Sequence, residues 1–303
     1  MSNPYFSNSK IFGDQRRAVN PYPGRAQAPN QAQGPWGQQP AAGQATAPAP
    51  GYDQQFAGVE QSFYGPSAGS MQTGRMTYDD VIMKSVGVLA VVVGVAVASW
   101  FIVPDGLKMP AMFVGLIGGI VLGLVNAFKR EPSPGLILTY AALEGVFLGM
   151  ISGVFEMLWP GIVVQAVLAT FITFGVTLAL FKSGKVRVTP KFTRFLMIGM
   201  ISYGIFCLIN LGIMWFTDFG GAFGVRSMEL NVLGMSIPLG VVIGLVAVVL
   251  AAMSLIMDFD AIQRGVQAGA PRKYAWAAAF GLTVTLIWLY IEFLRILAIL
   301  RGD

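Results

Sequence analysis

The chain has 303 residues and is far more apolar than an average soluble domain. Fifty-five percent of its residues are hydrophobic and only 12% are charged, whereas about a quarter of the residues in a soluble domain carry a charge. The formal net charge is +5, but the Lys and Arg residues cluster in short connections between apolar runs. That pattern excludes the continuous basic patch of a nucleic-acid-binding protein. We therefore expect a membrane protein that contacts the lipid bilayer and no nucleic acid.

Cysteine and histidine are too scarce for the common metal and redox sites. The only cysteine is Cys207, within an apolar run, and histidine is absent. A single cysteine excludes a disulfide framework and a zinc constellation, and the lack of histidine removes the usual group that titrates near neutral pH. We expect no resident cofactor, and any proton sensing must depend on carboxylates. An enzyme is the least favoured class, because the spans contain no pattern of nucleophile and base.

Residues 1–75 differ in composition from the rest of the chain. They are rich in Gly, Pro, Gln and Ala, as in GRAQAPNQAQGPWGQQPAAGQATAPAPG. Such a segment cannot bury enough apolar surface to offset the entropy lost on ordering. We expect a disordered cytoplasmic tail, without the pattern of a secretory signal peptide, followed by a membrane domain at 76–303. The tail is either a passive solvated segment, which its composition favours, or a contact site for partners through its scattered aromatic residues.

Seven apolar runs follow the tail, each near the length of about 20 residues that spans a bilayer. They are apolar on all sides and do not alternate in the manner of membrane barrel strands. The sequence therefore predicts an all-α polytopic membrane protein with seven transmembrane helices. The predicted spans are 83–103, 109–128, 135–159, 161–182, 194–216, 235–259 and 275–299.

The basic residues between the spans predict the orientation, because such residues concentrate on the cytoplasmic side. With a cytoplasmic N-terminus, the opposite loops contain only Lys108 and Arg226 as basic residues. Trp100, Trp159 and Trp215 fall at the far ends of the first, third and fifth runs, as an interfacial aromatic belt does. We therefore expect a multi-pass protein with its N-terminus in the cytoplasm.

Glycines recur four positions apart in three of the runs. Small residues at this spacing allow two helix backbones to approach closely inside a membrane, and we expect tight helix packing there. The glycines are Gly115, Gly119 and Gly123, then Gly145, Gly149 and Gly153, then Gly240 and Gly244.

Carboxylates inside the spans are the candidate functional residues, because charge is expensive in a membrane. Glu144 lies in the middle of the third run, with no basic residue within four positions. Asp258 and Asp260 close the sixth run in SLIMDFDAIQRG. Two positions turn a helix by about 200°, so only one aspartate can face the interior. We expect this to be Asp258, with Asp260 an interfacial carboxylate near Arg264, four positions on.

Glu292 in the seventh run has Arg295 three positions on, and the two can form a helical ion pair. Alternatively, Glu292 can lie beside another carboxylate. Two carboxylates in a low-dielectric interior cannot both ionise cheaply, so they share a proton and separate when it leaves. Their oxygens then become available to a hard cation. Ca²⁺ usually takes six to eight oxygens, so two side chains would form only a weak calcium site.

Three segments carry a family resemblance. SLIMDFDAIQ followed by WLYIEFLRIL resembles the paired C-terminal signature of the transmembrane Bax inhibitor motif family, and ALEGVFLGMISGVF is similar to its Glu-Gly-x-x-Leu-Gly segment. The resemblance covers about residues 78 to 300. It implies a bacterial plasma-membrane protein whose last helix is near the centre. It also implies a pH-sensitive calcium leak gated by a carboxylate pair, which by position is Asp258 and Glu292, and modulated by Lys129 and Arg130.

The chain departs from the family pattern at this pair. Glu292 replaces the common aspartate, Arg295 is a competing partner, and the connection GAPRKYAWAAAF is long. If the chain turns at 269–271, Asp258 and Glu292 differ in depth by about 15 Å at 1.5 Å per residue. They would meet only if residues 271–280 lay outside the membrane or along its surface. The alternative function is a non-conducting stress-regulatory protein that binds other membrane proteins, such as a membrane protease.

Overall fold

The computed structural model describes residues 74–217, 221–232 and 235–302, which belong to one compact unit, Pro66–Asp303. Within these described residues, seven helices are long and apolar enough to cross a membrane. This confirms the predicted all-α polytopic fold. The predicted disordered tail, 1–75, lies outside the described residues apart from its last two positions.

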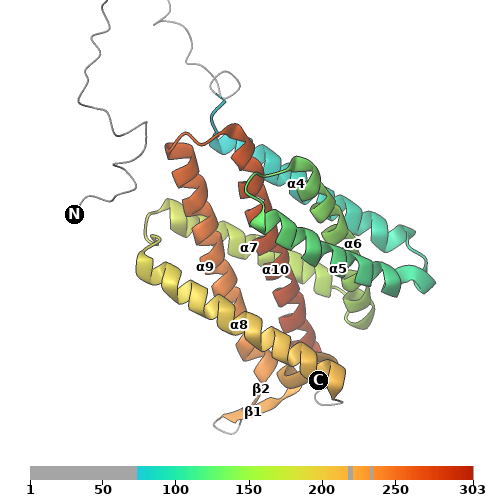
Figure 1. Ribbon diagram of the computed structural model, residues 1–303. Coiled ribbons are helices and arrows are strands. Elements are labelled where there is room, and N and C mark those ends of the chain that lie inside the picture. The colour runs from blue at the N-terminus through green and yellow to red at the C-terminus, as the bar shows by residue number, and fades with distance from the viewer. Residues whose placement is uncertain (1–73, 218–220, 233–234, 303) are drawn as a thin grey trace, which may run out of the picture. The chain divides into compact units, whose positions relative to one another are not determined.

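The spanning helices follow the predicted order, and most begin within about one turn of the predicted start (Figure 1). Threonines at two of these starts explain the earlier boundaries. The Thr77 hydroxyl accepts the backbone N–H of Asp80, and that of Thr189 accepts the backbone N–H of Phe192, as helix N-caps do. The helices are α4 (Tyr78–Ile102), α5 (Asp105–Phe128), α6 (Pro134–Leu158), α7 (Ile162–Lys182), α8 (Pro190–Phe216), α9 (Leu239–Gln267) and α10 (Ala275–Arg301).

A short 3-10 helix and a β-hairpin connect α8 to α9. The 3-10 helix is η1 (Gly221–Ser227), and the antiparallel strands are β1 (Glu229–Val232) and β2 (Met235–Pro238). The predicted start of the sixth span at residue 235 was therefore wrong. Pro238 ends β2 and forms the N-cap of α9. Proline is tolerated at this boundary because its missing N–H would have no helical partner there.

Helix α9 continues past the two aspartates that were expected to close it, and ends at Gln267. Gly269 then takes a positive φ of 63°, a conformation that glycine adopts without steric cost. Only 268–274 separate the two helices, because a 3-10 turn, η2 (Arg272–Tyr274), leads directly to Ala275 at the start of α10. Residues 275–280 are thus part of α10 rather than of an extended connection.

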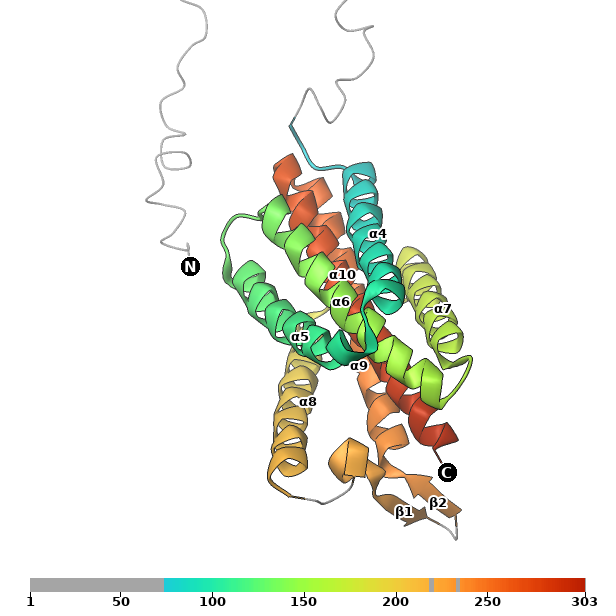
Figure 2. The ribbon, with the colours of Figure 1, turned by 90° about the vertical axis from the view of Figure 1, so that its right-hand side faces the viewer.

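Helix α10 is the central helix of the bundle. It packs against α4, α6, α7 and α9, as Figure 2 shows. Leu289, Glu292 and Leu294 on this helix are almost fully buried. The central position implied for the last helix by the family resemblance is confirmed.

The spaced glycines lie at helix contacts, as predicted. A Cβ on Gly115 of α5 would approach the backbone nitrogen of Phe147 in α6 to 2.7 Å, and one on Gly145 of α6 would approach the carbonyl oxygen of Val92 in α4 to 2.7 Å. Gly244 of α9 lies against Ile296 of α10. Larger side chains at these positions would force the helix backbones apart.

The segment before α4 is fastened to the α9–α10 connection. The Met76 N–H donates to the Ala270 carbonyl at 2.8 Å, and the Arg272 N–H donates to the Gly74 carbonyl at 2.8 Å. The Arg272 Nε also lies 2.7 Å from Oδ1 of buried Asp80. We name this end of the bundle the N-terminal end; η1 and the hairpin mark the opposite end, which we name the η1 end.

Candidate functional site

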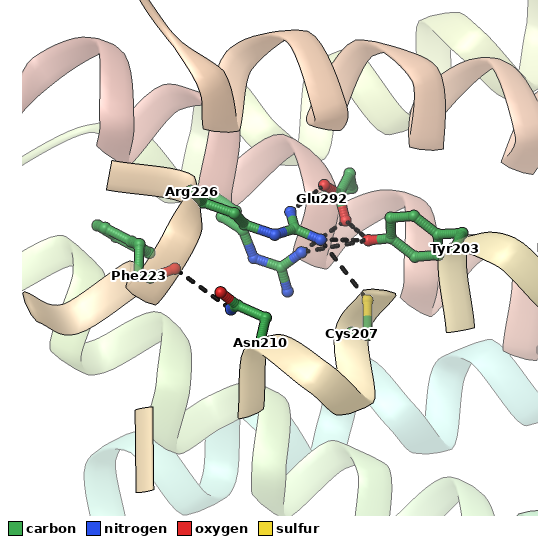
Figure 3. Close-up of polar contacts among 7 residues, drawn as sticks. Tyr203, Cys207, Asn210, Phe223, Arg226 and Glu292 are labelled. Atoms are coloured by element: carbon green, nitrogen blue, oxygen red, sulfur yellow. Dashed lines mark hydrogen bonds and ion pairs between the residues drawn. The ribbon is translucent and has the colours of Figure 1, made fainter. Parts of the chain in front are cut away.

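A buried cluster of charges surrounds Glu292 on α10. Its carboxylate is fully buried and accepts three hydrogen bonds (Figure 3). The Tyr203 hydroxyl of α8 and Nη1 of Arg295 each lie 2.7 Å from Oε2, and Nη1 of Arg226 lies 2.9 Å from Oε1. A buried charge is tolerated only when it is paired and hydrogen-bonded, and this carboxylate meets that condition. The helical pair of Glu292 with Arg295 is one of the two alternatives that the sequence left open.

Arg226 is the member of this cluster that sequence reasoning missed. It belongs to η1, outside the spanning helices, yet its side chain is only 3% exposed. Its Nη2 donates to the Tyr203 hydroxyl at 2.9 Å and to Sγ of Cys207 at 3.6 Å, and the guanidinium also lies 5.4 Å from the ring centre of Phe206. Burial alone would lower the pKa of Arg226, but the Glu292 carboxylate raises it, so the arginine stays charged. Arg226, which the sequence placed in an outer loop, is in fact a buried partner of Glu292.

Asn210 of α8 holds η1 in the position that brings Arg226 inward. Its side-chain oxygen accepts the Val225 N–H at 2.8 Å, and its amide nitrogen donates to the Phe223 carbonyl at 3.2 Å. Between them, Gly224 has a φ of 60°, and a Cβ there would lie 2.6 Å from the Asn210 side-chain oxygen. Both the bend and the space therefore require glycine.

The cluster contains an excess of positive charge. Two guanidinium groups, those of Arg226 and Arg295, share the single carboxylate of Glu292. Arg295 is the more accessible of the two, with 27% of its side chain exposed. In this arrangement the Glu292 oxygens are occupied by donors and are not available to a cation.

Asp258 of α9 lies in a separate polar contact nearer the N-terminal end. Its Oδ2 accepts the Thr285 hydroxyl of α10 at 2.8 Å, and a Cβ on Gly281 would lie 3.4 Å from its Oδ1. The aspartate is half-buried, and Thr285 is 5% exposed. The contact with Thr285 shows that Asp258 faces the central helix α10, in the predicted inward orientation. Within the described residues Asp258 forms no ion pair, so its charge has no basic partner.

The structure does not bring Asp258 and Glu292 together. Thr285, which binds Asp258, lies seven positions before Glu292 on α10, so the two levels are separated by about 10 Å along the helix. The expectation that the two carboxylates pair, and that they form one weak calcium site together, is therefore corrected. The reason is the short α9–α10 connection, 268–274, which leaves the depth mismatch uncompensated. In the described part of the chain, no three His, Cys, Asp or Glu residues form a metal-binding group.

The comparison with known families agrees with this architecture. The model of the family described as Bax inhibitor 1 like matches residues 3–302, nearly the whole chain. The chain belongs to the Bax inhibitor 1 like family. A search of curated proteins finds no match. The resemblance based on the three quoted segments is thus confirmed at the level of the family.

Other predicted site residues of this Bax inhibitor 1 like protein lie apart from both contacts. Asp260 forms the expected ion pair with Arg264, with 2.8 Å between Oδ2 and Nη2. Lys129 and Arg130 are exposed in the connection between α5 and α6. Within the described residues neither of these two forms an ion pair with Asp258 or Glu292, so the structure offers no direct route by which they would modulate these carboxylates.

Glu144 of α6 is another predicted carboxylate within a span. It faces α5, where a Cβ on Gly119 would lie 2.6 Å from its Oε1, and it lies one turn from Tyr140 on its own helix. It is half-buried and forms no ion pair with any residue that the structure describes. Its contacts place it in the α5–α6 interface, separate from the α9–α10 polar contacts.

Proposed function

We propose that this Bax inhibitor 1 like protein is a pH-sensitive, non-enzymatic cation leak channel that conducts calcium across the bacterial plasma membrane. The basic residues between its spans support a cytoplasmic N-terminus, as positively charged loops face the cytoplasm. An intramembrane ionisable residue without a basic partner marks an ion pathway or proton relay by default. Asp258 is such a residue, and it is central to the proposal.

The arrangement of polar groups along α10 is the observation that carries this proposal. Thr285 and Glu292 are seven positions apart, nearly two full turns, so they lie on the same face of α10. Thr285 binds Asp258 of α9, and Glu292 approaches Gly244 of the same helix. Two polar levels therefore follow one another along the α9–α10 interface, as successive sites of a conduction pathway would.

In the proposed closed state, Arg226 blocks the η1 end of the pathway by occupying Glu292. Opening requires Arg226 to leave Oε1 of this carboxylate, which then becomes available to a cation while Arg295 and Tyr203 stay bonded to Oε2. At the N-terminal end, Asp258 attracts a cation when ionised and loses that attraction when protonated. The expected sign is therefore more flux as the pH rises. In this proposal Asp258 alone senses protons, in place of the expected gate in which Asp258 and Glu292 share a proton.

A single carboxylate at each level suits a leak better than storage. Ca²⁺ binds tightly when six to eight protein oxygens surround it, and conduction requires binding weak enough for release. Asp258 and Thr285 together supply only a few oxygens, with water completing the shell. The calcium binding expected at either level is correspondingly weak.

The test is calcium influx into liposomes that contain the purified protein and an internal calcium indicator, at pH values from 5 to 8. We expect wild-type flux to rise with pH and Asp258→Asn flux to be low and flat. Asp260→Asn is the matched control, because this neighbouring carboxylate pairs with Arg264, and it should keep the wild-type pH profile. Equal profiles for Asp258→Asn and wild type would refute the role of Asp258.

The same assay separates conduction from the alternative role. Arg226→Gln should raise flux at the upper end of the pH range, where Asp258 is ionised, because it removes the group that occupies Oε1 of Glu292. If neither wild type nor Arg226→Gln conducts calcium, the leak proposal fails. The non-conducting protein that binds other membrane proteins then becomes the favoured function.

A further inference from the structure

A cavity of about 450 Å³ lies beside the buried charge cluster at the η1 end. Its walls come from α6, α8, α10 and η1, and both arginines of the cluster reach it. Its apolar wall includes side chains that are open to the outside of the bundle. These are Val154 and Leu158 of α6, and Leu211 and Met214 of α8, which are between 37% and 57% exposed.

The excess positive charge in the wall of this cavity favours the binding of an anion. Arg226 and Arg295 share one carboxylate, so one positive charge remains uncompensated among these contacts. Charge that is withdrawn from water is costly unless it is paired. Arg295 combines 27% exposure with a place in the cavity wall, so its guanidinium is the group best placed to meet an incoming anion.

The position of the cavity matches the headgroup region of a membrane. Trp159, at the end of α6, lines it, and Trp215, 76% exposed, lies near the end of α8. Tryptophan concentrates at the membrane–water interface. A molecule in the cavity would thus have its polar end at the level of phosphates and its apolar part against the exposed walls of α6 and α8.

We propose that this cavity binds the headgroup of an anionic phospholipid. The lipid phosphate would contact Arg295 at the edge of the cluster, and an acyl chain would lie along the apolar wall between α6 and α8. Guanidinium groups bind phosphate through charge-assisted, often bidentate hydrogen bonds. This inference is independent of the leak function, because the excess charge and the cavity exist whether or not a cation is conducted.

The test measures lipid binding by native mass spectrometry of the full-length protein in mixed micelles. The probes are dioleoyl-phosphatidylglycerol and dioleoyl-phosphatidylcholine, which share acyl chains and differ in net charge. We expect wild type to retain phosphatidylglycerol in preference to phosphatidylcholine. Arg295→Gln should weaken phosphatidylglycerol binding roughly tenfold, the effect of losing about 1.4 kcal/mol, while Arg295→Lys keeps the charge and part of the preference.

Arg264→Gln is the matched control, because it removes an exposed arginine of α9 near the N-terminal end of the bundle. A second variant, Leu211→Trp, narrows the cavity without altering the ion cluster, and it keeps the test decisive if Arg295→Gln does not fold. It should also reduce phosphatidylglycerol retention. Equal retention of the two lipids by wild type would overturn the proposal, as would an unchanged preference in both cavity variants.

A competition with glycerol 3-phosphate distinguishes a lipid from a soluble anion. This molecule carries the phosphate but no acyl chain, so we expect it to displace phosphatidylglycerol only weakly. Displacement at concentrations comparable to those of the lipid would show that the apolar wall contributes nothing. The site would then belong to a soluble phosphate, and the lipid proposal would be wrong.

Discussion

Arg226 and Glu292 form a buried ion pair across 66 positions of sequence, with 2.9 Å between Nη1 and Oε1. The arginine comes from the connection outside the spanning helices and the glutamate from the central helix α10. The contact joins the η1 end of the bundle to its interior. Any displacement of η1 must therefore change the surroundings of Glu292.

Substitutions of the two partners of this ion pair should lower the free energy of unfolding by different amounts. Glu292→Gln leaves Arg226 and Arg295 without a counter-charge, so we expect it to lower the free energy of unfolding by about 3–5 kcal/mol. Arg226→Gln leaves Glu292 still bound by Arg295 and Tyr203, and it should cost only about 1–3 kcal/mol. Thermal unfolding in detergent, followed by tryptophan fluorescence, gives the order of Tm values. A larger loss for Arg226→Gln would contradict the proposed charge balance.

The spanning helices could be predicted from the sequence because their signal is local. Each is a continuous apolar run of membrane length, and the positions of the runs require no knowledge of their neighbours. The β-hairpin was missed because Met235–Pro238 is nearly as apolar as α9, which follows it directly. Hydropathy alone cannot separate a short apolar strand from the first turn of an apolar helix.

The candidate site was only partly predictable, because its contacts depend on how distant segments bend. Counting residues on both sides of the turn predicted that Asp258 and Glu292 differ in depth. The same count from the short connection 268–274 places Asp258 at the level of Thr285 on α10. The inward position of Arg226 could not be found this way. It depends on the left-handed bend at Gly224 and the hydrogen bonds of Asn210. From the sequence, Arg226 is indistinguishable from an ordinary arginine of an outer loop.

The labelling rate of Cys207, the only cysteine of the chain, reports whether Asn210 holds η1 in place. Cys207 is half-buried and lies 3.6 Å from Nη2 of Arg226, so η1 in its observed position covers one side of the thiol. Asn210→Leu removes the hydrogen bonds to Phe223 and Val225, which costs about 1–3 kcal/mol. We expect a soluble maleimide to label Cys207 roughly tenfold faster in this variant. Cys207→Ser gives the background, and an unchanged rate would show that η1 does not cover the thiol.

The contact between α4 and α6 offers a test of glycine packing with an internal control. A Cβ on Gly149 would overlap the carbonyl oxygen of Ala96 and the hydroxyl of Ser99, whereas Gly94 has no atom within 4 Å of its Cβ position. Gly149→Ala should therefore lower stability by about 1–3 kcal/mol. Gly94→Ala should be neutral or stabilise by up to about 1 kcal/mol, because alanine favours helix. Equal Tm values for the two variants would contradict the close approach of these helices.

The fastening of the chain before α4 to the α9–α10 connection depends on Asp80. This buried carboxylate accepts from Arg272 at 2.7 Å and from the hydroxyl of Thr77 at 3.0 Å. Asp80→Asn removes its charge and weakens both contacts, each of which is charge-assisted and worth about 1.5–3 kcal/mol. We expect amide hydrogen exchange in 268–274 to become at least about tenfold faster, because the amide of Arg272 is bonded to Gly74.

Asp79→Asn is the control for this last variant, since Asp79 lies in the same first turn of α4 but is exposed. It should leave exchange in 268–274 unchanged, although both substitutions reduce the negative charge at the start of the helix equally. If the two variants exchange alike, the effect of Asp80 is only on the helix terminus. Faster exchange in Asp80→Asn alone would show that the ion pair with Arg272 orders the connection between α9, which carries Asp258, and α10, which carries Glu292.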